Sequence, residues 1–148
     1  MRIRLGVLCL LLTATTASAQ SLEQQGVCAK QAKIAFDEWN ADYTINKLPK
    51  PVTIDYQSHY NTKLNKCLIY IEATQPAGQG FLTIAVLMDA FERRVYASYA
   101  WSTRPNKKYW EVPPTNCDLI PTSQDKRTCT SKDEFDAFVA KHMEDKHA

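Results

Sequence analysis

The stretch "VTIDYQSHYNTKLNKCLIYIEA", Val52–Ala73, decides the fold. Its first half alternates with a period of two, with Ile54 and Tyr56 on one face, and this alternation predicts a half-buried strand. The polar segment "NTKLNK" (61–66) predicts a turn, and "CLIYIEA" (67–73) is rich enough in β-formers to predict a second strand. The stretch therefore indicates a β-hairpin.

Two further strands follow this hairpin. The segment "TQPAGQG" (74–80) carries one proline and two glycines and predicts a loop. The segment "FLTIAVLM" (81–88) is apolar on both faces, which is typical of a strand covered on both sides. After a predicted turn at "DAFER" (89–93), "RVYASYAW" (94–101) predicts a fourth strand. Short connections between these strands favour a four-stranded antiparallel meander.

Helical patterns flank the predicted sheet. Apolar residues at steps of three and four predict an N-terminal amphipathic helix: Cys28, Ala32, Ala35, Phe36, Trp39 and Tyr43. Near the C-terminus Ser131 and Glu134 form a capping-box pattern before a second stripe: Phe135, Phe138, Val139, His142 and Met143. Residues 102–128 show no sustained period and predict a long loop. The predicted fold class is α+β, with both helices on one face of the sheet.

The N-terminus has the pattern of an export signal. Arg2 and Arg4 precede an apolar run at Leu5–Leu12, and "ASA" at Ala17–Ala19 supplies small residues for cleavage. The run is too short to span a bilayer, which takes about 20 residues. We therefore predict a signal peptide over residues 1–19, cleavage between Ala19 and Gln20, and one domain over 20–148. The mature chain should be periplasmic or secreted, with no integral membrane segment.

Charge argues against a polyanionic partner. The chain has 18 Lys and Arg and 16 Asp and Glu, and loss of Arg2 and Arg4 with the signal leaves sixteen of each sign. A neutral mature chain lacks the electrostatic footprint expected for binding nucleic acid or anionic lipid. A local basic cluster, "RPNKK" at Arg104–Lys108, is explained at least as well by a solvated loop.

Four cysteines remain after cleavage, Cys28, Cys67, Cys117 and Cys129. An even number in an exported protein indicates disulfides. Four cysteines allow three connectivities, and the sequence does not choose between them. We favour Cys28–Cys67, which would tie the first helix to the sheet, and Cys117–Cys129, which would close the proline-rich loop. Long spacings and the absence of C-x-x-C predict no metal site, and we expect no cofactor.

His59 is a weak candidate for a general base. Its neighbour Ser58 cannot be its nucleophile, because adjacent strand residues point to opposite faces. The sequence holds no G-x-S-x-G elbow, no H-E-x-x-H motif and no glycine-rich phosphate loop. His142 lies on the apolar stripe of the last helix, where a core or boundary histidine is expected. These observations lean against an enzyme without excluding one.

The segment "KKYWEVPP", 107–114, is the best binding candidate. Tyr109, Trp110 and Val112 place apolar surface on a segment that two prolines hold extended, and Trp101 could extend that surface. The alternative is that Trp110 and Val112 cover the sheet edge or plug the core. The partner that we expect is a protein or a component of the cell envelope.

Three motifs resemble a family of small exported bacterial proteins: "SHYN-x-x-L-N-K-C" at Ser58–Cys67, "DAFE-x-x-x-YA-x-Y-x-W" at Asp89–Trp101, and "K-Y-W-E-V-x-P" at Lys108–Pro114 followed by a cysteine. The likeness runs from Cys28 through the final helix. It implies export, a bacterial origin, a helix-plus-sheet domain and a bond between Cys28 and Cys67. The family has no established activity, so the resemblance implies no catalytic residues.

Two classes of function remain. The first is a non-enzymatic binding or interaction module of the periplasm or exterior, stapled by two disulfides. The alternative is a small envelope hydrolase or transferase that uses His59, or an inhibitor of a cell-wall hydrolase.

Overall fold

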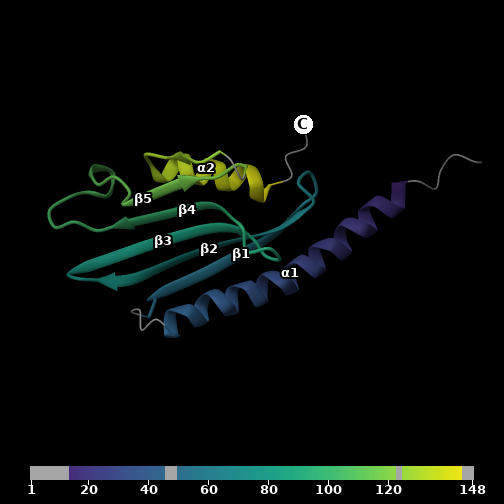
Figure 1. Ribbon diagram of the computed structural model, residues 1–148, viewed down its shortest axis with the longest axis horizontal. Coiled ribbons are helices and arrows are strands. Elements are labelled where there is room, and N and C mark those ends of the chain that lie inside the picture. The colour runs from purple at the N-terminus through teal and green to yellow at the C-terminus, as the bar shows by residue number, and fades with distance from the viewer. Residues whose placement is uncertain (1–13, 46–49, 123–124, 145–148) are drawn as a thin grey trace, which may run out of the picture.

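A six-stranded antiparallel sheet separates two helices in the computed structural model, which describes residues 14–45, 50–122 and 125–144 (Figure 1). The strands follow one another in space in chain order: β1 (Thr53–Asn61), β2 (Lys66–Ala77), β3 (Gly80–Asp89), β4 (Val95–Ser102), β5 (Asn116–Leu119) and β6 (Arg127–Thr128). The helices are α1 (Ala14–Ile45) and α2 (Lys132–Met143), and a short 3-10 helix, η1, covers Tyr109–Glu111. The predicted α+β class is confirmed.

The first four strands form the predicted meander, but the predicted strand number is wrong. The segment expected to be one long loop contributes β5 and β6, so the sheet has six strands. β5 pairs with β4 through the register Tyr99 to Cys117. The strand has four residues and only two buried side chains, Cys117 and Leu119, so it is too short for a period of two to be recognised in the sequence. Pairing with β4 creates this strand rather than local propensity.

The predicted loop at 74–80 is also wrong in its extent. β2 continues to Ala77, and only Gly78 and Gln79 form the turn. Pro76 is tolerated because the pairing of β1 with β2 ends at Thr74. No strand of the described chain therefore lies on the side of β2 where a backbone N–H at position 76 would donate. Gly78 has a φ of 59°, a conformation that costs glycine nothing. A Cβ on Gly80 would meet the hydroxyl of Thr103 at 1.8 Å, so that position also needs glycine.

The helix α1 packs against one face of the sheet. Its buried residues Cys28, Ala32 and Ala35 join a core with Ile69 and Ile71 of β2. The Phe36 ring stacks on Tyr56 of β1 with the ring centroids 4.5 Å apart. The predicted apolar stripe is therefore confirmed from Cys28 to Trp39; the side chain of Tyr43, like residues 1–13 of the predicted signal, lies outside the described part. The predicted cleavage point between Ala19 and Gln20 falls within α1.

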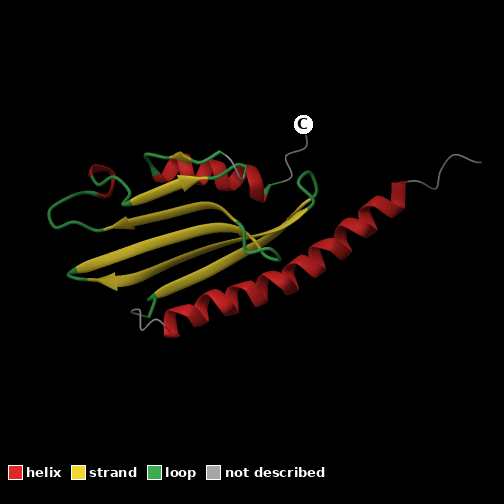
Figure 2. Ribbon diagram, viewed as in Figure 1, coloured by secondary structure: helices red, strands yellow, loops and turns green. Residues whose placement is uncertain are grey.

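The helix α2 covers the opposite face, so the expectation of two helices on one face is wrong (Figure 2). Phe135, Phe138 and Val139 pack with Leu68 of β2, the neighbour of Ile69, which faces α1. Successive strand residues point to opposite faces, so both faces of β2 are covered. The run "CLIYI" (67–71) has apolar side chains at successive positions, as expected for a strand that is covered on both faces.

The caps of α2 differ in detail from the predicted box. Ser131 Oγ accepts a hydrogen bond from the Glu134 N–H at 3.2 Å, as expected. The Glu134 carboxylate accepts from the N–H of Thr130 at 3.1 Å rather than from Ser131. His142 is half-buried, its Nδ1 donates to the Phe138 carbonyl oxygen at 2.8 Å, and its ring lies against Phe138 and Tyr96. It is the boundary histidine that the sequence predicted.

Both favoured disulfides are present. Cys28–Cys67 joins α1 to β2 with a Cα–Cα distance of 5.2 Å, and Cys117–Cys129 closes the β5–β6 segment at 5.0 Å. All four cysteines are buried. Such bonds fit a protein that folds in an oxidising compartment. Over the described residues, neither helix has the length and apolar character needed to cross a bilayer.

Candidate functional site

Trp110 is the most exposed large hydrophobic side chain in the described residues, with 75% of its surface accessible, and Tyr109 beside it is 49% exposed. Both belong to η1, within the connection that extends from β4 to β5 at one end of the sheet (Figure 1). The Lys108 N–H donates to the Glu111 carboxylate at 2.9 Å, and the Glu111 N–H donates to the Lys108 carbonyl at 3.0 Å. This reciprocal pair holds the turn that presents the two aromatic rings.

Trp101 anchors this turn to the sheet. Its indole Nε1–H donates to the carbonyl oxygen of Val112 at 2.9 Å, and its ring packs against Tyr109 with centroids 4.9 Å apart. Val112 is only 5% exposed. Its side chain therefore fills the core, as the alternative interpretation expected, while Trp110 points outward. The structure thus brings the four predicted residues together but divides them into two exposed rings and two anchors.

A hollow of about 280 Å³ lies between η1 and the start of α2. Tyr99, Trp110 and Pro113 line one side, and Thr130 and Asp133 line the other. We call it the Trp110 hollow. Aromatic rings and hydrogen-bonding groups that converge on one concave surface are typical of binding sites.

The Lys132 side chain also lines this hollow. Lys132 Nζ lies 2.6 Å from Asp136 Oδ1 and 3.5 Å from Glu72 Oε2, and it sits 5.7 Å from the centroid of the Tyr99 ring. Burial alone would lower the pKa of Lys132, but Asp136 and Glu72 outweigh that effect and the net shift is upward. The Lys132 cation is therefore neutralised by its own neighbours.

Two tyrosines adjoin Lys132 and Glu72. The Tyr70 hydroxyl donates to the Glu72 carboxylate. Burial raises the pKa of Tyr70, and the bond to Glu72 raises it further. Burial likewise raises the pKa of Tyr99, with a smaller contribution from Tyr109. A raised pKa keeps both hydroxyls protonated, so they act as hydrogen-bond donors rather than as bases.

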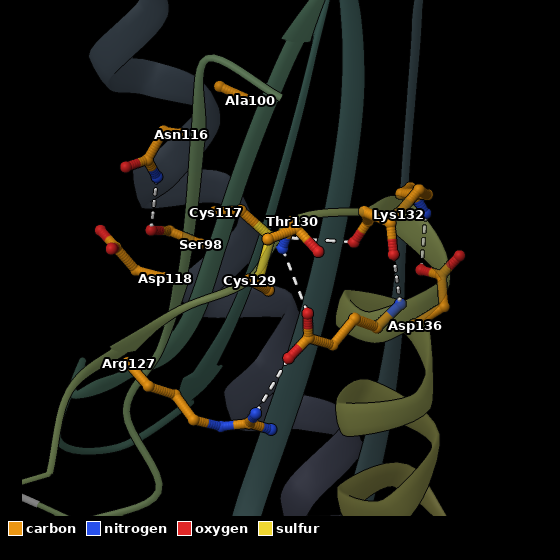
Figure 3. Close-up of a disulfide and its surroundings, with 12 residues drawn as sticks. Ser98, Ala100, Asn116, Cys117, Asp118, Arg127, Cys129, Thr130, Lys132 and Asp136 are labelled. Carbon is orange, nitrogen blue, oxygen red and sulfur yellow. Dashed lines mark hydrogen bonds and ion pairs between the residues drawn. A yellow bond between two sulfur atoms is a disulfide. The ribbon is translucent and has the colours of Figure 1, made fainter. Parts of the chain in front are cut away.

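The second disulfide, Cys117–Cys129, lies next to Thr130, which lines the hollow (Figure 3). Beside it the Cys129 N–H donates to the Cys117 carbonyl at 2.8 Å, and the Arg127 guanidinium bonds the Glu134 carboxylate at 2.9 Å. On β5, Asn116 Nδ2 donates to the Ser98 hydroxyl at 2.9 Å. These contacts connect the start of α2 through β6 and β5 to β4.

His59 lies apart from this region. It sits in β1 opposite Leu68, on the sheet face that α2 covers, and is half-buried. Ser58 is on the other face, as predicted, because it pairs with Ile69 of the α1 core. His59 does not line the Trp110 hollow or any of three other hollows on the described surface. A catalytic role for His59 stays a prediction, for which loss of activity in His59→Ala is the test.

The remaining residues of the "SHYN" motif have structural roles. The buried Asn61 accepts a hydrogen bond from the Leu64 N–H at 2.9 Å and donates to the His142 carbonyl at 2.8 Å. The backbone of Tyr60 pairs with Gln25 of α1. The motif thus joins the β1–β2 turn to both helices.

A second hollow, of about 360 Å³, lies between α1 and the turn after β3, with Val27 and Phe91 on its rim. The buried Asp89 at its edge accepts from the N–H groups of Phe91 and Glu92 and lies 3.3 Å from Lys66 Nζ. All of these bonds shape the β3–β4 turn, so Asp89 has a structural explanation. No cluster of three or more His, Cys, Asp or Glu within the described ranges could hold a metal ion.

Sequence reasoning missed the cluster formed by Tyr70, Glu72, Tyr99 and Lys132. A signal existed for part of it, because Tyr70 and Glu72 are two apart on one strand and so share a face. Lys132 comes from α2, and only the position of that helix over the sheet brings it to Glu72.

Comparison with family models, with curated proteins and with solved structures finds no match in any of the three.

Proposed function

We propose that this chain is an exported, non-enzymatic binding module that recognises a partner through the surface around Trp110. One observation carries the proposal. Trp110 is 75% exposed on a turn that is anchored on both sides. Exposing a large aromatic ring to water is unfavourable in the free protein, and rigid aromatic anchors are the residues that dominate binding energy at interfaces.

Pre-organisation supports the same proposal. The segment is held by the bond from Trp101 to Val112, by the Lys108–Glu111 pair and by the Cys117–Cys129 disulfide. A surface that is already ordered loses little conformational entropy on binding. The surface therefore needs only modest contact area to bind usefully.

Export is part of the proposal. Four buried cysteines in two disulfides suit the periplasm or the exterior, and the N-terminal pattern with cleavage between Ala19 and Gln20 supplies the route. Relationship to the small exported proteins with the "SHYN" and "YWEV" patterns is likewise proposed, on those motifs alone. A partner in the cell envelope fits this location.

Capture from an envelope fraction tests the proposal. Immobilised wild-type chain, Trp110→Ala and Ile34→Ala are compared, because Ile34 is an exposed apolar residue on α1, with 49% of its surface accessible. We expect Trp110→Ala to lose a component that both other chains retain. Identical captured components from all three chains would remove Trp110 from the interface and contradict the proposal.

A further inference from the structure

Exposed aromatic and basic side chains gather at one end of the sheet. The turn between β2 and β3 and the connection from β4 to β5 reach that end together (Figure 1). Phe81, which is 47% exposed, is fixed there by two hydrogen bonds with Thr103, each 2.9 Å long. We call this surface the tip and define it by six exposed residues: Phe81, Arg104, Lys107, Lys108, Tyr109 and Trp110.

The tip is locally positive. Three cations occur within five residues of sequence, at Arg104, Lys107 and Lys108, with no carboxylate between them. Within the described part of the chain, no carboxylate forms an ion pair with Arg104 or Lys107. Lys108 Nζ lies 5.1 Å from the centroid of the Trp110 ring. Glu111 is the nearest acid in sequence; it accepts from the Lys108 backbone N–H and keeps its negative charge, so residues 104–111 carry a net charge of +2.

The neutral net charge of the predicted mature chain does not imply an even distribution of charge over its surface. Eight carboxylates of the described residues form ion pairs, as in Lys33–Asp37, Arg93–Glu38 and Arg127–Glu134, and none of the eight pairs with a cation of the tip. The cations of the tip are left facing water beside exposed aromatic rings. A chain without net charge can therefore still present a basic surface at one end.

We propose that the tip binds the headgroup surface of an anionic lipid bilayer, with Trp110 and Tyr109 at the interface and the three cations against the headgroups. Tryptophan and tyrosine favour the membrane interface because their rings are apolar at one side and polar at the other. Lysine and arginine near an anionic bilayer add electrostatic attraction. The inference rests on the proposed function, since it uses the same surface and names its partner.

The shape of the tip favours a bilayer over a polymeric ligand. The cations and rings lie on the connection from β4 to β5, whose first part loops out beyond the end of β4 (Figure 2), whereas a bound chain would need a groove that tracks it. The Trp110 hollow is walled by Lys132 and Asp133, and Lys132 is already neutralised by Glu72 and Asp136. The unpaired charge is outside that hollow, on the projecting part.

Vesicle co-sedimentation tests the inference. The exported chain is purified with both disulfides formed and its N-terminus verified, since an uncleaved signal would itself bind lipid. Vesicles of phosphatidylcholine with about 30% phosphatidylglycerol are compared with pure phosphatidylcholine. We expect binding only to the anionic vesicles, weakened as salt rises from about 50 to about 300 mM because the charges are solvent-exposed.

Matched variants separate the two parts of the tip. Arg104→Gln with Lys107→Gln should weaken partitioning about 30-fold, at roughly fivefold for each charge. Lys30→Gln with Lys141→Gln removes the same charge from exposed positions on the two helices and should change it less than about twofold. Trp110→Ala should weaken it about tenfold, whereas Ile34→Ala should not.

Several results would overturn the inference: no binding to anionic vesicles at low salt, equal binding to neutral vesicles, or equal losses from the two charge variants. Tight binding to double-stranded DNA that Trp110→Ala leaves intact would make the tip a general polyanion site instead. If vesicle binding fails while Trp110-dependent capture from the envelope fraction persists, the lipid inference is wrong and the proposed binding function stands.

Discussion

The indole N–H of Trp101 donates a hydrogen bond to the carbonyl oxygen of Val112, 2.9 Å away. This bond crosses from β4 to the segment that follows η1. Because the Val112 side chain is buried, the backbone at this residue is held from both its side chain and its carbonyl. The exposed ring of Trp110, two residues earlier, therefore starts from a fixed position.

Replacing Trp101 by phenylalanine should loosen the candidate site without touching Trp110. The variant keeps an aromatic ring against Tyr109 and removes the only N–H donor of the side chain. Loss of this bond should cost about 1 kcal/mol of stability. Hydrogen exchange measured by mass spectrometry should be faster in peptides covering 109–115. In the capture experiment, the variant should retain less of the partner.

Trp39→Phe is the matched control, because Trp39 is also half-buried but belongs to α1 and packs on the other face of the sheet. It should leave exchange in peptides 109–115 unchanged. If both variants change that exchange equally, the bond to Val112 does not position the site.

The two disulfides should contribute unequally to stability. They close segments of 39 and 12 residues, and the loop-entropy model gives about 4 kcal/mol for Cys28–Cys67 and about 3 kcal/mol for Cys117–Cys129. Urea unfolding of the two double alanine variants measures both values. A larger loss from the shorter loop would show that strain or native packing outweighs chain entropy.

Binding should rank these two variants in the opposite order. Cys117–Cys129 lies next to Thr130, which lines the Trp110 hollow, whereas Cys28–Cys67 lies between α1 and β2, away from it. Under conditions where both variants are folded, removal of Cys117–Cys129 should weaken partner capture more. If both variants capture the partner equally, Cys117–Cys129 contributes to stability but not to binding.

The first four strands and both helices could be predicted because their patterns are local. Ile54 and Tyr56 alternate with polar residues, and Cys28, Ala32 and Ala35 recur at helical steps. β5 and β6 could not be predicted, because they are short and depend on pairing with β4. The placement of α2 also could not, since only the buried surface on both sides of β2 decides which face it covers.

The candidate site divides in the same way. Trp110 and Tyr109 were recognisable as large aromatic residues on a proline-bounded segment. Whether each ring pointed inward or outward depends on Trp101 and Val112, which the fold brings together. The basic cluster at Arg104–Lys108 was visible too, but its position beside Phe81 follows from the pairing of β3 with β4.

Gln25 should protect the edge of the sheet. Its side-chain amide donates to the Tyr60 carbonyl and accepts from the Tyr60 N–H, both at 3.0 Å, so it pairs with β1 as another strand would. Gln25→Ala should cost about 2 kcal/mol, at about 1 kcal/mol for each lost bond, and should promote association through the exposed edge. Urea unfolding and light scattering measure the two effects.

Gln24→Ala is the control for this edge, because it removes the same side chain one position earlier on α1. Gln25→Glu keeps the acceptor and loses the donor, so its cost should fall between those of the two alanine variants. If Gln24→Ala and Gln25→Ala are equally destabilising, the pairing with Tyr60 contributes little and helix propensity explains both.

The protein should lose stability at alkaline pH through Tyr70 and Tyr99. Burial raises the pKa of both hydroxyls in the folded state, while an unfolded tyrosine ionises near pH 10. Above about pH 10 the folded state therefore binds more protons than the unfolded state, and stability falls as pH rises. Thermal unfolding measured from pH 7 to pH 11 should show a decline that begins near pH 10.

Tyr70→Phe removes one of the two groups, so its decline should be shallower, although at pH 7 it loses about 1 kcal/mol with the bond to Glu72. Parallel curves for the wild type and Tyr70→Phe above pH 10 would show that Tyr70 does not cause the alkaline loss.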